Sequence, residues 1–265
     1  MFIHGMNLMK PAASGFFALC ALMLAPMQKA SAAELHVLAA GAVEAVIRDM
    51  VVSFEHKSGH TVKITYAPVG ALRDLMYAGE IPDVIIVTPV IIEELHARGL
   101  VCAGTRIDLG RVGGGIAVRK GVSHPKIRTP EELKQALLAV KEIYYADPKI
   151  ATAGEYFLTV ADHLGIGNEV RKKVRTAGGG KASMELMSRS SAEAIGLTQI
   201  SEILSVPAVE LVGPYPVNLQ RMTIYSGILC HRTKNHVVAK KFLQFLTSEP
   251  VKARFKQQGF EVADR

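Results

Sequence analysis

The sequence predicts an α/β protein with parallel-rich sheets that carry helices on both faces. Apolar strand-like runs alternate with amphipathic helical patterns along most of the chain. The run at 82–88 is apolar through its centre, as buried parallel strands are. No internal repeat or low-complexity linker breaks this order, and 265 residues provide enough units for two small sheets. We therefore expect two lobes that are assembled discontinuously from the chain.

The elements follow one another in βα order from residue 34 onward. Strand 34–39 leads to helix 42–57, and strand 61–67 leads to a second helix that opens within 68–80. The pattern then continues with strand 82–88, helix 89–99, strand 113–121, helix 129–140, strand 142–147, helix 152–165, strand 174–177, helix 181–191, strands 193–198, 209–213 and 222–231, and a helical stretch at 236–259.

Residues 1–33 have the pattern of a secretory signal peptide. A basic residue precedes an apolar stretch from Phe16 to Leu24, and small residues around Ala32 and Ala33 offer a cleavage site. The apolar stretch is about half of the ~20 residues that a membrane span requires, which disfavours an anchor. We therefore expect a soluble mature protein that is exported to the periplasm.

The charge pattern narrows the class of partner. Without residues 1–33 the chain keeps 29 basic and 24 acidic residues, a formal charge of +5. This modest excess suits a small anionic ligand. Basic residues stand singly or in pairs and are not interleaved with aromatics, so we expect no nucleic-acid partner.

The sequence contains no pattern for a metal or a cofactor. Cys102 and Cys230 have no second Cys or His at metal-ligand spacing, and we expect buried free thiols, although pairing in an oxidising compartment stays open. The glycines at 178–180 lack the remaining residues of a phosphate-binding loop, and those at 113–115 have no dinucleotide-binding setting.

Several motifs carry a family resemblance that covers essentially the whole mature chain. The segments "AAGAVEAV", "YAPVGAL", "AGEIPDVIIV", "HARGLV", "YYADPKIATAGEYFLTVADHLGI" and "SAEAIGLTQISEI" resemble the molybdate-binding branch of the type II periplasmic solute-binding proteins. The resemblance implies a two-lobed clamp, with lobe I at 34–113 and 226–265 and lobe II at 114–225. Two strands, near 113–118 and 223–228, would cross between the lobes as a hinge. It also implies a monomer that delivers its ligand to the membrane permease of an ABC importer.

Small residues at helix starts point to an anion site. Ala40, Gly41 and Ala42 open the first helix, where a capping Ser, Thr, Asp or Asn is usual. In open α/β sheets ligands bind beyond the carboxyl ends of the strands, where uncapped helix starts present N–H groups to an anion. The same pattern recurs at two other helix starts, formed by Val69, Gly70 and Ala71 and by Ala153 and Gly154. The alternative is that these residues form tight, closely packed turns.

The chain departs from the molybdate binders at positions that would hold the ligand. That family places Ser hydroxyls in the first two loops and a Tyr after a late strand, whereas this chain has Ala42, Val69 or Gly70, and Gln199. Arg73 lies one turn into the second helix, and a guanidinium grips carboxylates bidentately. We therefore expect an organic carboxylate rather than molybdate, with a solvated helix residue as the alternative for Arg73. Two further cations flank other predicted loops, Lys181 and Arg221.

A second resemblance points to catalysis. The segments "GGIAVRKG", "LTQISEI" and "MTIYSGIL" resemble the exported aconitate isomerases of the same branch. That activity needs a base that takes an allylic proton from a tricarboxylate and returns it elsewhere. Candidates near predicted loops are Glu44, Glu155 and Tyr225, and Tyr225 is a candidate ligand contact as well. The helix dipole alone favours the two glutamates in first turns, and Tyr225 could be a packing residue of the hinge. Solute binding is the leading hypothesis and isomerisation is the alternative.

Overall fold

The computed structural model describes residues 32–263, so the predicted signal peptide lies outside the described residues except for its last two positions. Residues 32–265 form one compact unit, and everything below concerns that unit. Within its described part no helix is both long and apolar enough to cross a membrane.

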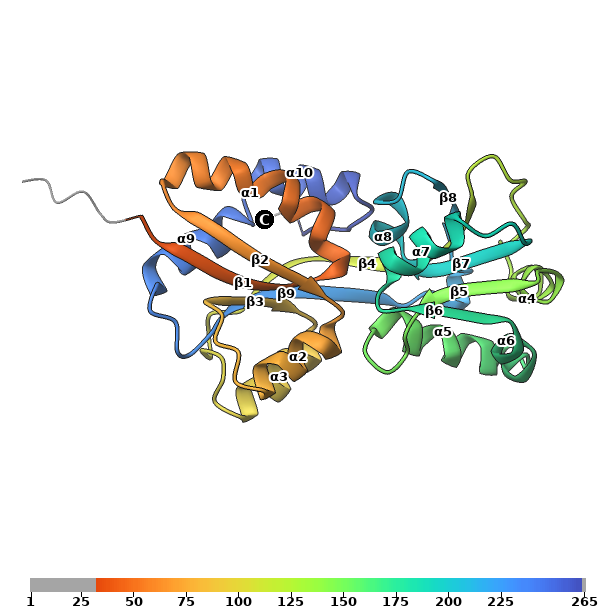
Figure 1. Ribbon diagram of the computed structural model, residues 1–265, viewed down its shortest axis with the longest axis horizontal. Helices are drawn as coiled ribbons and strands as arrows, with labels where there is room; N and C mark the ends of the chain where they lie inside the picture. The colour runs from red at the N-terminus through yellow and green to blue at the C-terminus, as the bar shows by residue number, and fades with distance from the viewer. Residues whose placement is uncertain (1–31, 264–265) are drawn as a thin grey trace, which may run out of the picture. The chain divides into compact units, whose positions relative to one another are not determined.

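The first lobe is a five-stranded sheet in the order β2-β1-β3-β9-β4 (Figure 1). β1 (Glu34–Ala40) pairs in parallel with β2 (Thr61–Ala67) and β3 (Val84–Val87). β9 (Met222–Leu229) is antiparallel both to β3 and to the first half of β4 (Ile107–Arg119). The helices of this lobe are η1 (Gly41–Val43), α1 (Glu44–Ser58), α2 (Val69–Tyr77), α3 (Pro89–Ala97), α9 (His236–Phe245) and α10 (Glu249–Gln257).

The second lobe is built on the other half of β4. From Gly114 onward β4 pairs antiparallel with β7 (Ala194–Gln199) and β8 (Val209–Pro214). β5 (Glu142–Ala146) then lies parallel to β7 and to β6 (Val174–Ala177). The helices of this lobe are α4 (Pro130–Ala139), α5 (Thr152–His163), α6 (Gly167–Lys173), α7 (Gly180–Ser188), α8 (Ile200–Leu204) and η2 (Val217–Leu219).

Each lobe buries its own apolar core. The buried cluster of the first lobe includes Leu35, Ile85 and Phe242. The second lobe packs one cluster around Phe157 and another around Met184. Separate cores are what allow two parts of one chain to move as units.

Two segments connect the lobes, as the fold class requires. β4 leaves β9 at Gly113, joins β7 at Gly114 and joins β8 at Gly115, so the strand is continuous across the junction. The returning segment is tied to it by Gln220, whose Nε2 donates to the Gly114 carbonyl at 2.9 Å and whose Oε1 accepts from the Gly114 N–H at 3.0 Å. The two-lobed α/β fold is confirmed, and the predicted limits of the lobes remain a proposal.

The sheets are mixed rather than parallel throughout. β4 carries the chain from the first lobe to the second and β9 begins its return, so the two strands run in opposite directions where they pair. Local apolar patterning predicts that β4 and β9 are strands, but it does not determine whether they pair in parallel or antiparallel.

Candidate functional site

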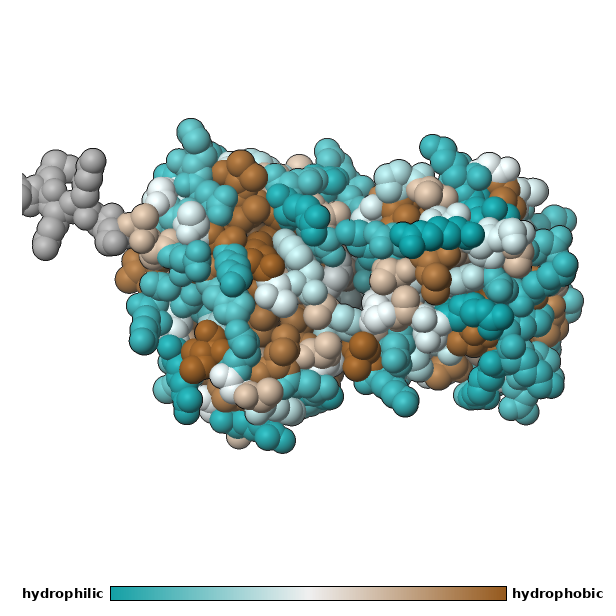
Figure 2. Space-filling view, in the orientation of Figure 1, coloured by the Kyte–Doolittle hydropathy of each residue, from teal (hydrophilic) through white to brown (hydrophobic). Residues whose placement is uncertain are grey.

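A cavity of about 230 Å³ lies where the two lobes meet. The starts of η1–α1 and α2 line it from the first lobe, and the starts of α5 and α7 line it from the second. Figure 2 shows a hollow in the surface between the lobes. The cavity is smaller than the ~300–1,000 Å³ typical of sites for drug-sized ligands, so it suits a small solute.

The helix starts around this cavity lack side-chain caps. The helix starts that line it have Ala40, Pro68, Ala151 and Gly179 at their N-caps, and none of these makes a side-chain capping hydrogen bond. By contrast, α4 lies away from the cavity and has a complete capping box at Thr129. Uncapped helix starts leave N–H groups unpaired, and the helix dipole favours negative charge beside them.

One helix start is already occupied by a carboxylate of the protein itself. Glu202 of α8 is 8% exposed, lines the cavity and accepts a hydrogen bond of 2.5 Å from the Thr198 hydroxyl. Backbone N–H groups of Gln199, Gly180 and Lys181 donate to it as well. Burial raises the pKa of Glu202, and these hydrogen bonds act in the opposite direction.

The sequence-based argument did not single out Glu202. Its signal is an acidic residue three positions after the N-cap residue Gln199, half of a capping box. That pattern predicts a helix start, but it does not reveal that the same carboxylate also covers the start of α7.

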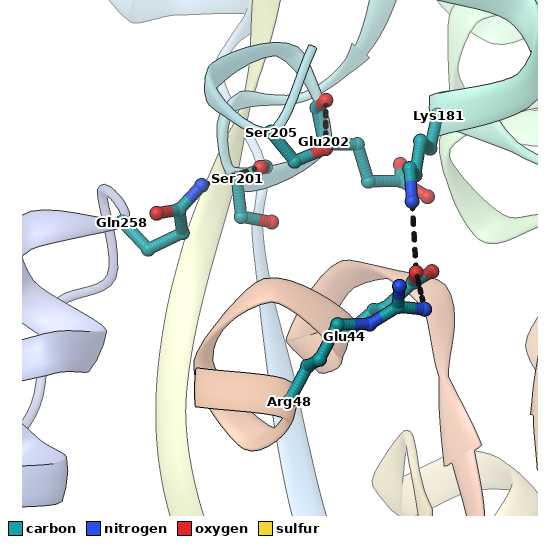
Figure 3. Close-up of polar contacts among 7 residues, drawn as sticks. All are labelled: Glu44, Arg48, Lys181, Ser201, Glu202, Ser205 and Gln258. Atoms are coloured by element: carbon teal, nitrogen blue, oxygen red, sulfur yellow. Dashed lines mark hydrogen bonds and ion pairs between the residues drawn. The ribbon is translucent and has the colours of Figure 1, made fainter. Parts of the chain in front are cut away.

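An ion pair joins the lobes at the rim of the cavity. Lys181 Nζ of α7 lies 2.8 Å from Glu44 Oε1 of α1, and Arg48 contacts the same oxygen at 2.5 Å (Figure 3). Close by, Gln258 donates a hydrogen bond of 3.1 Å to the Ser201 carbonyl. Two cations therefore hold the Glu44 carboxylate, which makes it a poor candidate for a free base.

Hydroxyl groups reach the cavity from positions other than those the family resemblance suggested. Tyr66, Thr152 and Tyr225 all line it. Burial raises the pKa of Tyr66, with Glu44 adding to the shift and Arg48 opposing it. Burial likewise raises the pKa of Tyr225, helped by Glu202 and opposed by a hydrogen bond with Gln199. Both phenols therefore stay protonated and can donate, so the loss of hydroxyls inferred from the loops is partly made up.

Gln199 is buried at the back of the same cavity. Its Nε2 donates to the Thr223 hydroxyl at 3.0 Å, and its Oε1 is buried without a hydrogen-bond partner. A buried acceptor of this kind is costly unless a ligand or water supplies a donor.

The comparison with protein families decides what kind of molecule this cavity belongs to. The model of the bacterial extracellular solute-binding proteins matches residues 35–261, nearly all of the described chain. The chain belongs to this family.

This solute-binding protein is similar in sequence to one curated relative and in fold to several solved structures. An aconitate isomerase from Pseudomonas sp is 27% identical over 233 residues, which cover 86% of this chain and 87% of the relative. The periplasmic molybdate-binding protein of Azotobacter vinelandii superposes with a TM-score of 0.73 at 18% identity, covering 87% of this chain and 100% of the other. The sulfate-binding protein SubI from Mycobacterium tuberculosis gives a TM-score of 0.71 at 16% identity, with 88% of each chain covered.

The solute-binding protein brings most of the residues expected at the site into the cavity. Those that line it are Ala40, Gly41, Ala42, Glu44, Val69, Ala153, Gln199 and Tyr225. Ala71 lines neither this cavity nor its neighbour. Gly154 allows the start of α5 to pack closely against the end of β5, because a Cβ at this position would collide with the Ala146 carbonyl.

Gly70, Arg73 and Glu155 line a second, adjacent cavity of about 630 Å³ instead. The Gly70 N–H donates to the Ile150 carbonyl at 2.9 Å, a contact between the lobes at this second cavity. Arg73 lies 2.9 Å from Asp74 and 3.7 Å from Glu94. Arg73 therefore lines the second cavity and not the first, and the expectation that it grips a ligand carboxylate stays a prediction.

The remaining sequence expectations concern thiols and metals. Cys230 is buried and Cys102 is half-buried, and both are free. Burial raises the pKa of the Cys230 thiol, with Asp83 and Cys102 adding to the shift. Within residues 32–263 no three His, Cys, Asp or Glu side chains gather as metal ligands would.

Proposed function

We propose that this protein captures a small organic acid in the first cavity and presents it to the permease of an ABC importer. The observation that carries the proposal is the meeting of uncapped helix starts from both lobes on one small cavity. Backbone N–H groups arranged in this way bind anions. Membership of an extracellular solute-binding family, and neighbours named for molybdate and sulfate binding, support the anionic class.

The charges around the cavity favour an organic carboxylate over molybdate. Glu44, Glu185 and Glu202 line it against the single cation Lys181. A compact oxyanion carries charge on every oxygen, so the oxygens that face these carboxylates would be repelled. An organic acid keeps its carboxylates at the helix starts and rests its carbon skeleton on small apolar residues such as Ala42 and Ala153.

The same proposal includes a periplasmic location and a monomeric state. The signal peptide expected at 1–33 would export the chain to the periplasm, where binding proteins of this fold meet their permeases. The clamp needs only its own two lobes to enclose the ligand, so we propose a monomer.

Calorimetric titration and thermal shift of the mature chain test the proposal. Citrate, tricarballylate and succinate are compared with molybdate and sulfate at neutral pH. A carboxylate at 100 times its Kd adds about 2.7 kcal/mol to the free energy of unfolding, which raises Tm by roughly 5–11 °C for a chain of this size. Molybdate binding at or below ~1 µM, about −8 kcal/mol, with no response to any carboxylate would refute the proposed ligand class.

The second candidate is an aconitate isomerase. A relative of that name matches most of both chains, and three titratable groups, Glu202, Glu44 and Tyr225, meet in the cavity. In such a reaction a base removes a proton from the methylene carbon, the double bond shifts, and the proton is delivered to the other end of the allyl system. Because two cations hold Glu44, Glu202 is the better base in this chain.

Proton NMR of cis-aconitate in D₂O separates the two candidates. Isomerisation would give trans-aconitate with deuterium in its methylene group, and Glu202→Gln would abolish it while the variant still binds. Saturation of the parent protein with cis-aconitate without isomerisation or exchange would leave solute binding as the function.

A further inference from the structure

The Glu202 carboxylate is held between the backbones of two helix starts from opposite lobes. On the second-lobe side, a Cβ added to Gly180 would collide with it. On the first-lobe side, a Cβ added to Gly41 would lie 3.2 Å from Glu202 Oε1. The carboxylate therefore stands at the place where a ligand anion would meet α7, and one of its oxygens is turned toward the start of η1.

The hydrogen bonds of Glu202 come from one side. Among the described residues its donors are Thr198, Gln199, Gly180 and Lys181, all in the second lobe. Figure 3 shows Glu202 beside Lys181, whose ammonium points to Glu44 instead. Gln199 also lines the cavity, and its Oε1 is buried without a hydrogen-bond partner.

Among the residues that the structure describes, no Lys or Arg side chain forms an ion pair with the Glu202 carboxylate. Lys181 of α7 is paired with Glu44 of α1. Tyr225 of β9 and Tyr66 of β2 are protonated phenols, because burial raises their pKa. Glu185 of α7 adds a further carboxylate to the lining. This end of the cavity therefore offers acceptors and negative charge, whereas the starts of η1, α2 and α5 offer donors.

We propose that Glu202 is the specificity-determining residue of the cavity, where its carboxyl shares a hydrogen bond with an O–H group of the ligand. The inference rests on the proposed function and names its ligand class. Organic acids that carry a hydroxyl or an un-ionised carboxyl beside their carboxylates satisfy both ends of the cavity. Fully deprotonated tetrahedral oxyanions satisfy only the donor end and are repelled at the other.

Ligand pairs on the parent protein provide the first test. Citrate and tricarballylate differ by one hydroxyl, as do malate and succinate. If the hydroxyl supplies the O–H, the hydroxylated member of each pair binds about tenfold more tightly at pH 7.5, a typical gain for one hydrogen bond to a charged group. If an un-ionised carboxyl supplies it, the members bind alike, and both tighten as the pH is lowered toward 5.5.

The Glu202→Gln variant provides the second test, with Glu169→Gln as the matched control because Glu169 is exposed on α6 and outside the cavity. Glutamine keeps the shape and can still accept from Thr198 and the helix start. The variant should lose the hydroxyl preference or the pH dependence seen in the parent. It should also gain molybdate affinity on the order of tenfold, because the repelling charge is gone.

The outcomes separate this inference from the function on which it rests. If the parent binds no organic acid, the proposed function and the inference both fail. If the parent binds organic acids but Glu202→Gln keeps the same preferences and gains no oxyanion affinity, only the inference fails. If Glu202→Gln does not fold, as judged by circular dichroism, the ligand pairs decide, and equal, pH-independent binding within both pairs overturns the inference.

Discussion

The two cavities between the lobes share Val69, Ala151 and Thr152 but are built by different means. The first, of about 230 Å³, is framed by helix starts and holds a buried carboxylate. The second, of about 630 Å³, is lined by several charged side chains, and both of its arginines have partners. Arg73 there is paired with Asp74 and Glu94, and Arg221 lies 4.4 Å from the ring of Tyr156.

Under the proposed function, this difference assigns anion recognition to helix starts and not to guanidinium groups. Arginines are readily identified in a sequence as candidate anion-binding residues. In this protein, however, Arg73 and Arg221 already interact with side chains of the same chain. At the first cavity the expected donors to an anion are backbone N–H groups of helix starts, which residue types do not identify. The sequence signal for them is the lack of a capping side chain at Ala40, Pro68 and Ala151.

The largest effect is expected from Gly70→Val, which changes the contact between the lobes at the second cavity. A Cβ there would lie 2.9 Å from the Ile150 carbonyl oxygen and 3.0 Å from its Cα, so the lobes could not approach as closely. Overpacking of this kind costs about 1–3 kcal/mol, and we expect ligand affinity to fall about 10- to 100-fold in calorimetry. The free energy of unfolding without ligand should change little, because the lobes can separate.

Ala71→Val is the control for Gly70→Val, since Ala71 lies on the same helix and lines neither cavity. It should bind as the parent does. Parent-like affinity of Gly70→Val would show that close approach of α2 to the second lobe is not needed for binding.

A moderate effect is expected from Lys181→Met, which removes the ion pair across the rim of the first cavity. The ammonium is about one-third exposed, so its pair with Glu44 is worth about 1 kcal/mol, and affinity should fall roughly fivefold. Combination with Glu44→Gln in a double-mutant cycle measures the coupling between the two residues.

Lys172→Met serves as the control for Lys181→Met, because Lys172 is exposed on α6. If the effects of Lys181→Met and Glu44→Gln on affinity are additive, the ion pair between these two residues does not contribute to closure of the two lobes around the ligand.

The smallest effect is expected from Arg73→Ala, which tests the second cavity. The position of Arg73 one turn into the second helix led us to expect direct contact with a carboxylate, and loss of such a charge-assisted bond would cost ten- to a hundred-fold in affinity. The structure predicts less than about threefold, because Arg73 lies outside the first cavity and is bound to Asp74. A loss of tenfold or more in calorimetry would place the ligand in the second cavity.

The sequence by itself determined the fold class and the backbone part of the site. Apolar periodicity is local, so the strand at 84–87 and the helix after Gly41 could be predicted from a few neighbouring residues. The small residues at 40–42 also marked the opening of the first helix as an uncapped one, and the structure places it in the first cavity.

Tertiary structure alone decided which side chains face the cavity. Glu44 and Lys181 are 137 positions apart, and the start of α7 meets Glu202 only after two strands have paired. Val69 lines the first cavity, whereas Arg73, about one helical turn later on the same helix, lines only the second, because the direction of a side chain depends on the rotation of its helix against the sheet. Burial, which raises the pKa of Glu202, likewise arises from elements that are distant in the sequence. Residue types and their spacing do not determine distances between residues far apart in the sequence. The sequence therefore predicted an anion site but not the Glu202 carboxylate within it.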